Sequence, residues 1–254
     1  MKHDIFFSIS QTPDVNGETP TERAMFENYF QQLKHADTLG FGVGWIAQAH
    51  LSTETQKLNS MPVVPHWQGE VGLCTDFPQL ALESFRQTKH IEIGSAVISI
   101  LASGGPIAQA ERIANTVQFL SMLDEQRKLH VGFSAGRFEF MAKPYGIAPR
   151  NSWEAIGWKP LRSQIFLEAS EIFLRLLNGE TIASSDIRET SLSRENFRSD
   201  EEWDTFYQDY KSNNNDDVTS KITIPNRYNF EQISIIPQQW NRDQLQLVAG
   251  THDP

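Results

Sequence analysis

The chain has 254 residues, and 32 Asp and Glu against 22 Lys and Arg give it a formal net charge of −10. Cys74 is the single cysteine, so a disulfide framework and a cysteine zinc cluster are excluded, and a reducing compartment is expected. The acidic balance and the lack of any run of Lys and Arg argue against nucleic acid binding as the main function.

The amino-terminal stretch MKHDIFFSISQTPD has too short an apolar segment for a signal peptide. Nowhere do the roughly 18 consecutive apolar residues of a membrane span occur. We therefore expect a cytoplasmic protein that does not associate with membranes.

Short apolar runs rich in β-formers alternate with segments of helical periodicity along much of the chain. Five buried strands are expected, at 4–10, 41–47, 91–101, 128–134 and 245–249. Helices are expected from Pro20, after an N-cap at Thr19, to a stop at Gly40; at 77–88, after an N-cap at Thr75 or Asp76; at 107–123; and at about 160–178. This alternation predicts right-handed βαβ units on a parallel sheet.

The stretch from 180 to about 232 has a different character, with the acidic run SDEEWDTF and the polar run KSNNNDDVTS. We expect a partly mobile surface insertion rather than a separate domain. Its aromatic residues indicate that some of it packs, namely Phe197, Trp203, Phe206 and Tyr207.

Three segments carry a resemblance to a known family: GFGVGWIAQAH at 40–50, IEIGSAVISILASGGPIAQAERIANTVQFLSML at 91–123 and RKLHVGFSAGRFEF at 127–140. In this order and spacing they resemble the bacterial-luciferase-like flavin-dependent monooxygenases. The resemblance covers most of residues 1–180 and returns at 233–254. It implies an α/β fold of the (β/α)8 TIM-barrel type, with the site at the carboxyl ends of the strands.

The number of strands departs from that barrel. With roughly 30 residues per βα unit, the five expected strands leave the last three βα units absent. We therefore expect a single domain over 1–254, a barrel truncated after the fifth strand with the insertion at about 180–232. Family habit predicts a homodimer, and an open parallel sheet favours association.

His50 follows the second strand, where the family commonly has Glu-His-His and this chain has Gln48-Ala49-His50. The resemblance implies proton transfer by this catalytic histidine, because an imidazole suits acid/base work. The alternative is a histidine that only hydrogen-bonds a loop. The other histidines considered have no metal-ligand spacing, so no metal is predicted; they are His35, His66, His90 and His130.

The resemblance also implies cofactor contacts. Ser95, Ala96 and Val97 would lie against the flavin ring, although small residues also occur in ordinary barrel layers. Ser134, Gly136 and Arg137 would lie beside the ribityl phosphate, where Arg137 can bind a phosphate or instead pair with an acid of the insertion. Gly250 and Thr251 match the family's phosphate site at the end of the fifth strand.

The implied function is oxygenation of a small organic substrate with O2 and FMNH2 supplied by a separate NAD(P)H-dependent reductase. Three alternatives stay open: a deazaflavin-dependent oxidoreductase, a non-catalytic flavin-binding member, and a fragment of a longer enzyme. Candidates for an apolar substrate pocket are Trp45, Trp67, Trp153, Trp158, Phe138 and Phe140, about half of which are expected in the core or an interface. The sequence does not identify the substrate.

Overall fold

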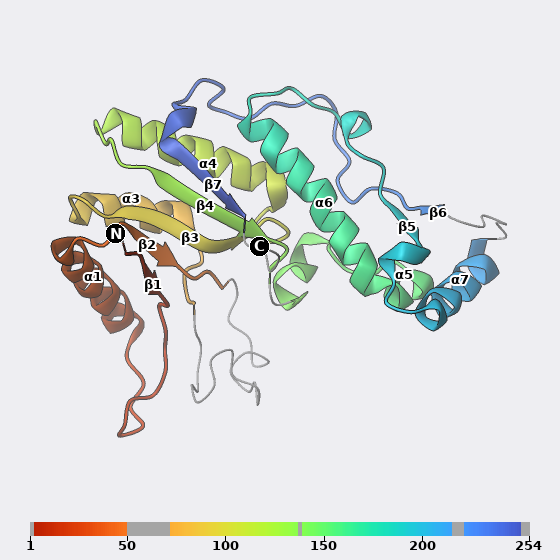
Figure 1. Ribbon diagram of the computed structural model, residues 1–254, viewed down its shortest axis with the longest axis horizontal. Helices are drawn as coiled ribbons and strands as arrows, with labels where there is room; N and C mark the ends of the chain where they lie inside the picture. Colours follow the sequence, from red (N-terminus) through yellow and green to blue (C-terminus); the bar gives the residue numbers. More distant parts are fainter. Residues whose placement is uncertain (1–2, 50–71, 137–138, 215–220, 250–254) are drawn as a thin grey trace. The chain divides into compact units, whose positions relative to one another are not determined.

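A computed structural model describes residues 3–49, 72–136, 139–214 and 221–249. The chain forms two compact units (Figure 1). The first contains 1–99, 112–134 and 239–254, and the second contains 100–111 and 135–238. No helix in the described ranges is long and apolar enough to cross a membrane.

The first unit is built on a five-stranded sheet in which every neighbouring pair is parallel, in the order β1-β2-β3-β4-β7. The strands are β1 (Ile5–Phe7), β2 (Val43–Ile46), β3 (Glu92–Ser99), β4 (Leu129–Ser134) and β7 (Leu245–Ala249). All five expected strands are present, although β1 is shorter than the predicted 4–10. The predicted fold class, α/β of the barrel type, is confirmed.

Helices connect these strands on the side of the sheet that buries Ile93 and Val131, both fully inaccessible to solvent. They are α1 (Glu22–Leu39), α3 (Phe77–Gln87) and α4 (Gly105–Met122). α3 packs on β3 and beside α1. The Tyr29 and Ser84 hydroxyl groups, one from each of α1 and α3, lie 2.8 Å apart in the buried interface.

The helix ends follow local chemistry. The N-cap of α1 is Thr21, whose side chain accepts a hydrogen bond from the Ala24 N–H, so the predicted N-cap at Thr19 and start at Pro20 are wrong. Gly40 ends this helix as predicted, in the left-handed conformation. Asp76 is the N-cap of α3.

The carboxylate of Asp37, near the end of α1, fixes the turn that enters β3. It accepts hydrogen bonds from three consecutive backbone N–H groups at 89–91, at 2.7 to 2.9 Å. Partial burial acts to raise the pKa of Asp37, but these N–H groups outweigh burial and lower the pKa below its ordinary value of 3.8. This carboxylate therefore stabilises the fold in its charged form.

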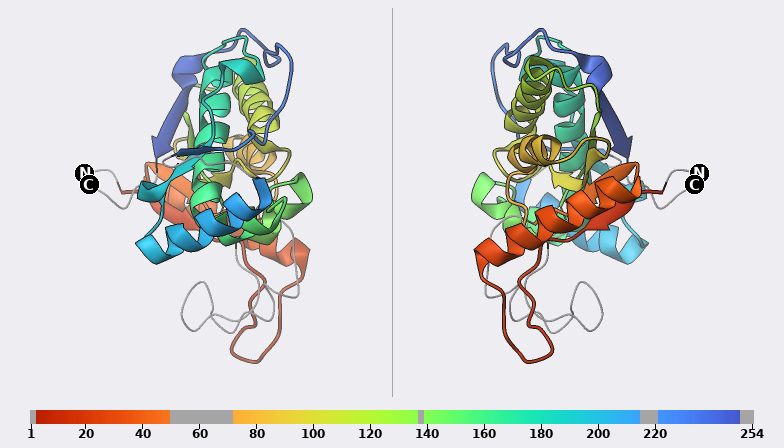
Figure 2. Two further views of the ribbon diagram at one scale, coloured as in Figure 1. Left: turned by 90° about the vertical axis from the view of Figure 1, so that its right-hand side faces the viewer. Right: turned by 90° about the vertical axis from the view of Figure 1, so that its left-hand side faces the viewer.

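The second unit is mainly helical, with α5 (Ser152–Ile156), α6 (Trp158–Leu177) and α7 (Asp200–Asn214), and it carries a two-stranded antiparallel sheet of β5 (Ser191–Ser193) and β6 (Lys221–Thr223). α7 lies against α5 (Figures 1 and 2). Short 3-10 turns occur at Glu139–Met141, Lys143–Tyr145, Ser184–Asp186 and Arg194–Asn196 in this unit, and at Arg242–Gln244 in the first.

Helix α7 lies inside the predicted insertion, where no helix was predicted. Phe197, Trp203 and Phe206 are buried and their rings contact one another, while Tyr207 stacks on Trp203. The prediction that aromatic residues pack part of this stretch is confirmed.

A buried ion pair stabilises the second unit. Arg227 Nη2 donates to Glu154 Oε2 at 2.6 Å, with only 3% and 2% of the two side chains exposed. Glu154 also accepts the Arg150 N–H, and the buried Glu168 accepts the N–H groups of Arg227 and Tyr228. Burial raises the pKa of Glu168 above its ordinary value, although these N–H groups act against it.

Candidate functional site

The carboxyl ends of parallel strands share one edge of the sheet, and binding residues of α/β barrels come from that edge. The register places Ser99 of β3 opposite Ser134 of β4, and Phe133 of β4 opposite Ala249 of β7. Ser95, Ala96, Val97 and Ser134 therefore lie on two adjacent strands of the first unit. Gly136 lies in the second unit, and His50, Arg137, Gly250 and Thr251 fall outside the described residues.

The hydroxyl group of Ser95 is committed to the sheet. Ser95 is fully buried; its Oγ donates to the carbonyl oxygen of Gly132 at 2.8 Å and accepts the N–H of Gly132 at 3.0 Å. Both interactions join β3 to β4. The hydroxyl group thus shapes the strand pair.

Strand β3 is irregular directly after Ser95. Its register against β4 shifts between Ser95 and Ile98, and the Ala96–Val97 peptide bond is cis. Ala96 and Val97 are partly exposed, whereas the residues on either side of them are buried. A register shift of this kind redirects side chains and is common beside active sites.

Val97 lies over Gly132. A Cβ atom on Gly132 would stand 2.8 Å from Val97 Cγ1 and 2.7 Å from the carbonyl oxygen of Ser95. Only glycine fits there without displacing the backbone of β3. The Val97 side chain therefore packs directly on the backbone of β4 at Gly132.

An aromatic layer precedes this small-residue layer on the same face of the sheet, because residues two apart on a strand share a face. Trp45 lies across Gly94, where a Cβ atom would come within 2.5 Å of its ring. The Trp45 and His130 rings meet edge to face, with 5.6 Å between centroids. Trp45 Nε1 donates to Asp4 Oδ2 at 3.1 Å, which fixes the indole.

His130 also pairs with an acid. Its Nε2 lies 2.6 Å from Glu92 Oε2, and only 12% of the histidine side chain is exposed. An imidazole paired with a carboxylate can hold or transfer a proton. In the sequence, His130 has no metal-ligand spacing, and it was not paired with Glu92. The signal that would have paired them is register, which places Glu92 and His130 near the starts of adjacent strands.

Two loops after β1 and β2 meet at the same edge. The Ser8 hydroxyl oxygen accepts the Gly72 N–H at 3.1 Å, and the Ala49 N–H donates to the Gly72 carbonyl oxygen. Gln48 donates to the Thr75 carbonyl oxygen at 3.4 Å, while its own Oε1 is buried and accepts no hydrogen bond from the described residues. An acceptor in this position is suited to a ligand N–H.

Cys74, in the second of these loops, is not a nucleophile in this fold. It is only 2% exposed, and burial raises the pKa of its thiol to about 12. The reactive thiolate form is therefore rare near neutral pH.

In the second unit, Arg162 of α6 positions the loop after β4. Its Nη2 donates to the carbonyl oxygens of Ala135 at 3.1 Å and Gly136 at 2.6 Å. Gly136 has a φ of 79°, which favours glycine. Sequence reasoning missed Arg162, because nothing local links a residue of this helix to a loop some 26 positions earlier. Over the ranges described, no group of three or more His, Cys, Asp and Glu side chains could hold a metal ion.

Comparisons with known proteins give a likeness of structure. No family model and no curated protein matches the sequence. The monooxygenase RslO1 from Streptomyces bottropensis matches with a TM-score of 0.56 at 15% identity, over 99% of this chain and 54% of that one. The chain thus spans about half the length of RslO1.

Two further solved structures match less well. The oxygenating constituent of 3,6-diketocamphane monooxygenase from Pseudomonas putida, in complex with FMN, has a TM-score of 0.49 at 17% identity, over 72% of this chain and 41% of its own. An F420-dependent secondary alcohol dehydrogenase has a TM-score of 0.41 at 15% identity, over 79% and 46%. The likeness to RslO1 supports, at the level of the fold alone, the resemblance to luciferase-like monooxygenases.

Proposed function

We infer that this chain carries the flavin site of a luciferase-like monooxygenase, which uses FMNH2 and O2 to oxygenate a small organic substrate. The inference rests on two successive layers of side chains on one face of the sheet. The aromatic layer of Trp45 and His130 is followed, toward the carboxyl ends, by Val97 packed on Gly132. A flat ring system could lie against Val97, with the packed rings of Trp45 and His130 closing the site beneath it.

The residues present fit a flavin on two counts. Val97 and Ala96 are partly exposed at the edge where barrel sites form. The buried Oε1 of Gln48 accepts no hydrogen bond from the described residues, and it is an acceptor of the kind that a flavin ring N–H requires. Reduced flavin, when bound, would supply the electrons that activate O2.

The protein's own residues would orient the ring and exclude water. Trp45 would close the floor, and the His130–Glu92 pair would hold a proton at His130 Nε2. His50 is proposed as the acid or base. Arg137, Ser134, Gly136, Gly250 and Thr251 are proposed at the phosphate, and Ser95 would act only by shaping β3. A separate NAD(P)H-dependent reductase and a homodimer complete the proposal.

The test is an anaerobic titration of the chain with photoreduced FMN, run beside a reduced deazaflavin. Val97→Trp would place a bulky ring at the proposed flavin surface, and Val15→Trp is the matched control because Val15 is fully exposed. We expect the native chain and Val15→Trp to bind FMN alike, and Val97→Trp to bind at least about tenfold more weakly. Equal binding by both variants would exclude this surface.

Two outcomes separate the alternatives. Preference for the deazaflavin would favour the hydride-transfer oxidoreductase, and failure to bind either would overturn the proposal. If FMN binds, O2 consumption driven by an added flavin reductase distinguishes an enzyme from a non-catalytic member. Arg137→Ala is expected to weaken FMN binding by about 1.5–3 kcal/mol.

A further inference from the structure

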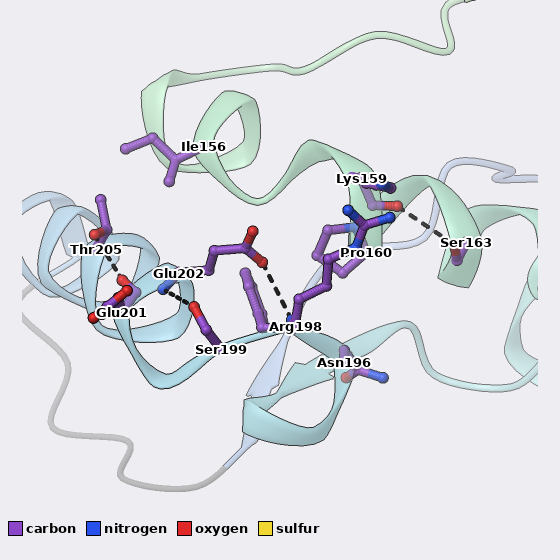
Figure 3. Close-up of a pocket in the computed structure, with 11 residues that line it drawn as sticks. Ile156, Lys159, Pro160, Ser163, Asn196, Arg198, Ser199, Glu201, Glu202 and Thr205 are labelled. Carbon is purple, nitrogen blue, oxygen red and sulfur yellow. Dashed lines mark hydrogen bonds between the residues drawn. The ribbon is translucent and has the colours of Figure 1, made fainter.

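The second unit contains a cavity of about 580 Å³, remote in sequence from the proposed flavin residues. It lies between the amino-terminal part of α6 and the start of α7 (Figure 3). Small-molecule sites have volumes of roughly 300–1,000 Å³. Its size therefore suits a small metabolite.

Four charged side chains, all of them solvent-exposed, line the cavity. Figure 3 shows Arg198 and Lys159 on one side and Glu201 on the other, with Glu202 between them. The Lys159 ammonium and the Arg198 guanidinium have no hydrogen bond or ion pair with any described side chain. The Glu201 carboxylate likewise has none among these residues, whereas Glu202 accepts the Arg198 backbone N–H at 3.2 Å.

An anionic group of a ligand would be attracted to Lys159 and Arg198, which lie on the same side of the cavity. A purely anionic ligand would also face the carboxylates of Glu201 and Glu202. The four side chains sum to zero formal charge. A ligand that is itself neutral overall but carries separated charges therefore matches the site better than an anion or a cation.

The lining also offers apolar contact. Ile156, Pro160 and Phe197 contribute to the wall, and Phe197 is anchored because it is 7% exposed and packs on Phe206. An apolar wall beside paired opposite charges matches the three parts of an aliphatic amino acid: its carboxylate, its ammonium group and its side chain.

We propose that this cavity binds a small zwitterion of the aliphatic amino acid class, with the carboxylate at Arg198 and Lys159 and the ammonium group at Glu201 and Glu202. None of the residues that line this cavity is among the proposed flavin residues, and the proposal does not depend on flavin binding. The cavity would give the chain a second ligand, recognised by its own residues.

The test compares three probes by nuclear magnetic resonance titration of the isotope-labelled full chain. L-Leucine carries both charges, 4-methylpentanoate lacks the ammonium group and 3-methylbutylamine lacks the carboxylate. We expect leucine to bind with a Kd below about 10 mM, at least about tenfold more tightly than either single-charge probe. The shifted resonances are expected to come from the cavity residues.

Variants then assign the charges. Arg198→Gln and Glu201→Gln are each expected to weaken leucine binding at least about tenfold. Arg188→Gln is the matched control, because Arg188 is an exposed arginine of the same unit outside the cavity lining. Equal binding of leucine and 4-methylpentanoate would overturn the zwitterion, and no binding of leucine, or equal loss in Arg188→Gln, would overturn the site.

Discussion

Ser95 and Gly132 are joined twice across β3 and β4, since one hydroxyl oxygen both donates to the Gly132 carbonyl oxygen and accepts the Gly132 N–H. The same Gly132 leaves the space that Val97 covers. The polar contact and the steric one therefore act on the same short piece of backbone. Together they fix the irregular part of β3 on which the proposed ring surface depends.

Ser95→Ala is expected to destabilise the chain by about 1–3 kcal/mol, because it leaves a buried N–H and a buried carbonyl without their partner. Urea unfolding measures the change. Ser212→Ala is the control, since the Ser212 hydroxyl group donates to the Gln208 carbonyl oxygen on an exposed helix face. A Ser95→Ala loss no larger than that of Ser212→Ala would contradict the structural role.

Gly94→Ala is expected to cost about 1–3 kcal/mol, because its methyl group would meet the Trp45 ring at 2.5 Å. The near-ultraviolet circular dichroism of the tryptophan should change as well. In a Trp45→Leu background the same substitution should cost clearly less, and the difference between the two costs gives the coupling. Identical costs in both backgrounds would show that Trp45 does not lie across Gly94.

The lowered pKa of Asp37 predicts how the stability of the fold depends on pH. Its pKa is lowered in the folded state, so the unfolded chain binds its proton at higher pH than the folded chain does. The stabilisation is complete above the unfolded pKa, near 3.8, and is lost as the pH falls through the lower folded value. Chemical unfolding at pH values from about 6 down to about 2 measures the effect. The free energy of unfolding should fall less on acidification in Asp37→Asn than in the native chain. Parallel pH curves for the two chains would refute this.

Breaking the buried ion pair should have a large effect. Arg227→Met leaves the Glu154 carboxylate buried without its cation, and a loss of about 3–5 kcal/mol is expected. The double variant Arg227→Met with Glu154→Leu removes both charges and should recover part of that loss. Calorimetric unfolding measures the stability of both variants. If the double variant is no more stable than Arg227→Met, the uncompensated charge of Glu154 is not the cause of the loss.

The elements that could be predicted from sequence are those whose cause is local. The apolar runs of the five strands and the Gly40 stop are read directly from neighbouring residues. Helix α7 was missed because its polar composition hides Trp203, Phe206 and Tyr210, whose spacing of three, four and seven places them on one helical face. Thr21 rather than Thr19 begins α1 because its own hydroxyl reaches the Ala24 N–H.

The site was less predictable, because its contacts depend on register between strands distant in sequence. The family resemblance placed Ser95 against the flavin ring, yet its hydroxyl group bonds Gly132, 37 positions later. His130 and Glu92 are 38 positions apart, and neither residue alone suggests the other. The predicted roles of His50, Arg137, Gly250 and Thr251 stay predictions.

The register shift in β3 also changes which residues of the strand face the helices. Between the pairs Ser95 with Val131 and Ile98 with Phe133, β3 advances by three residues while β4 advances by two. The odd-numbered Ile93 faces the helices before the shift, and the even-numbered Ile98, also fully buried, takes over that side after it. If β3 kept every residue but paired regularly with β4, Ile98 would turn to the face opposite Ile93, so the register shift is what keeps both ends of β3 in the same core.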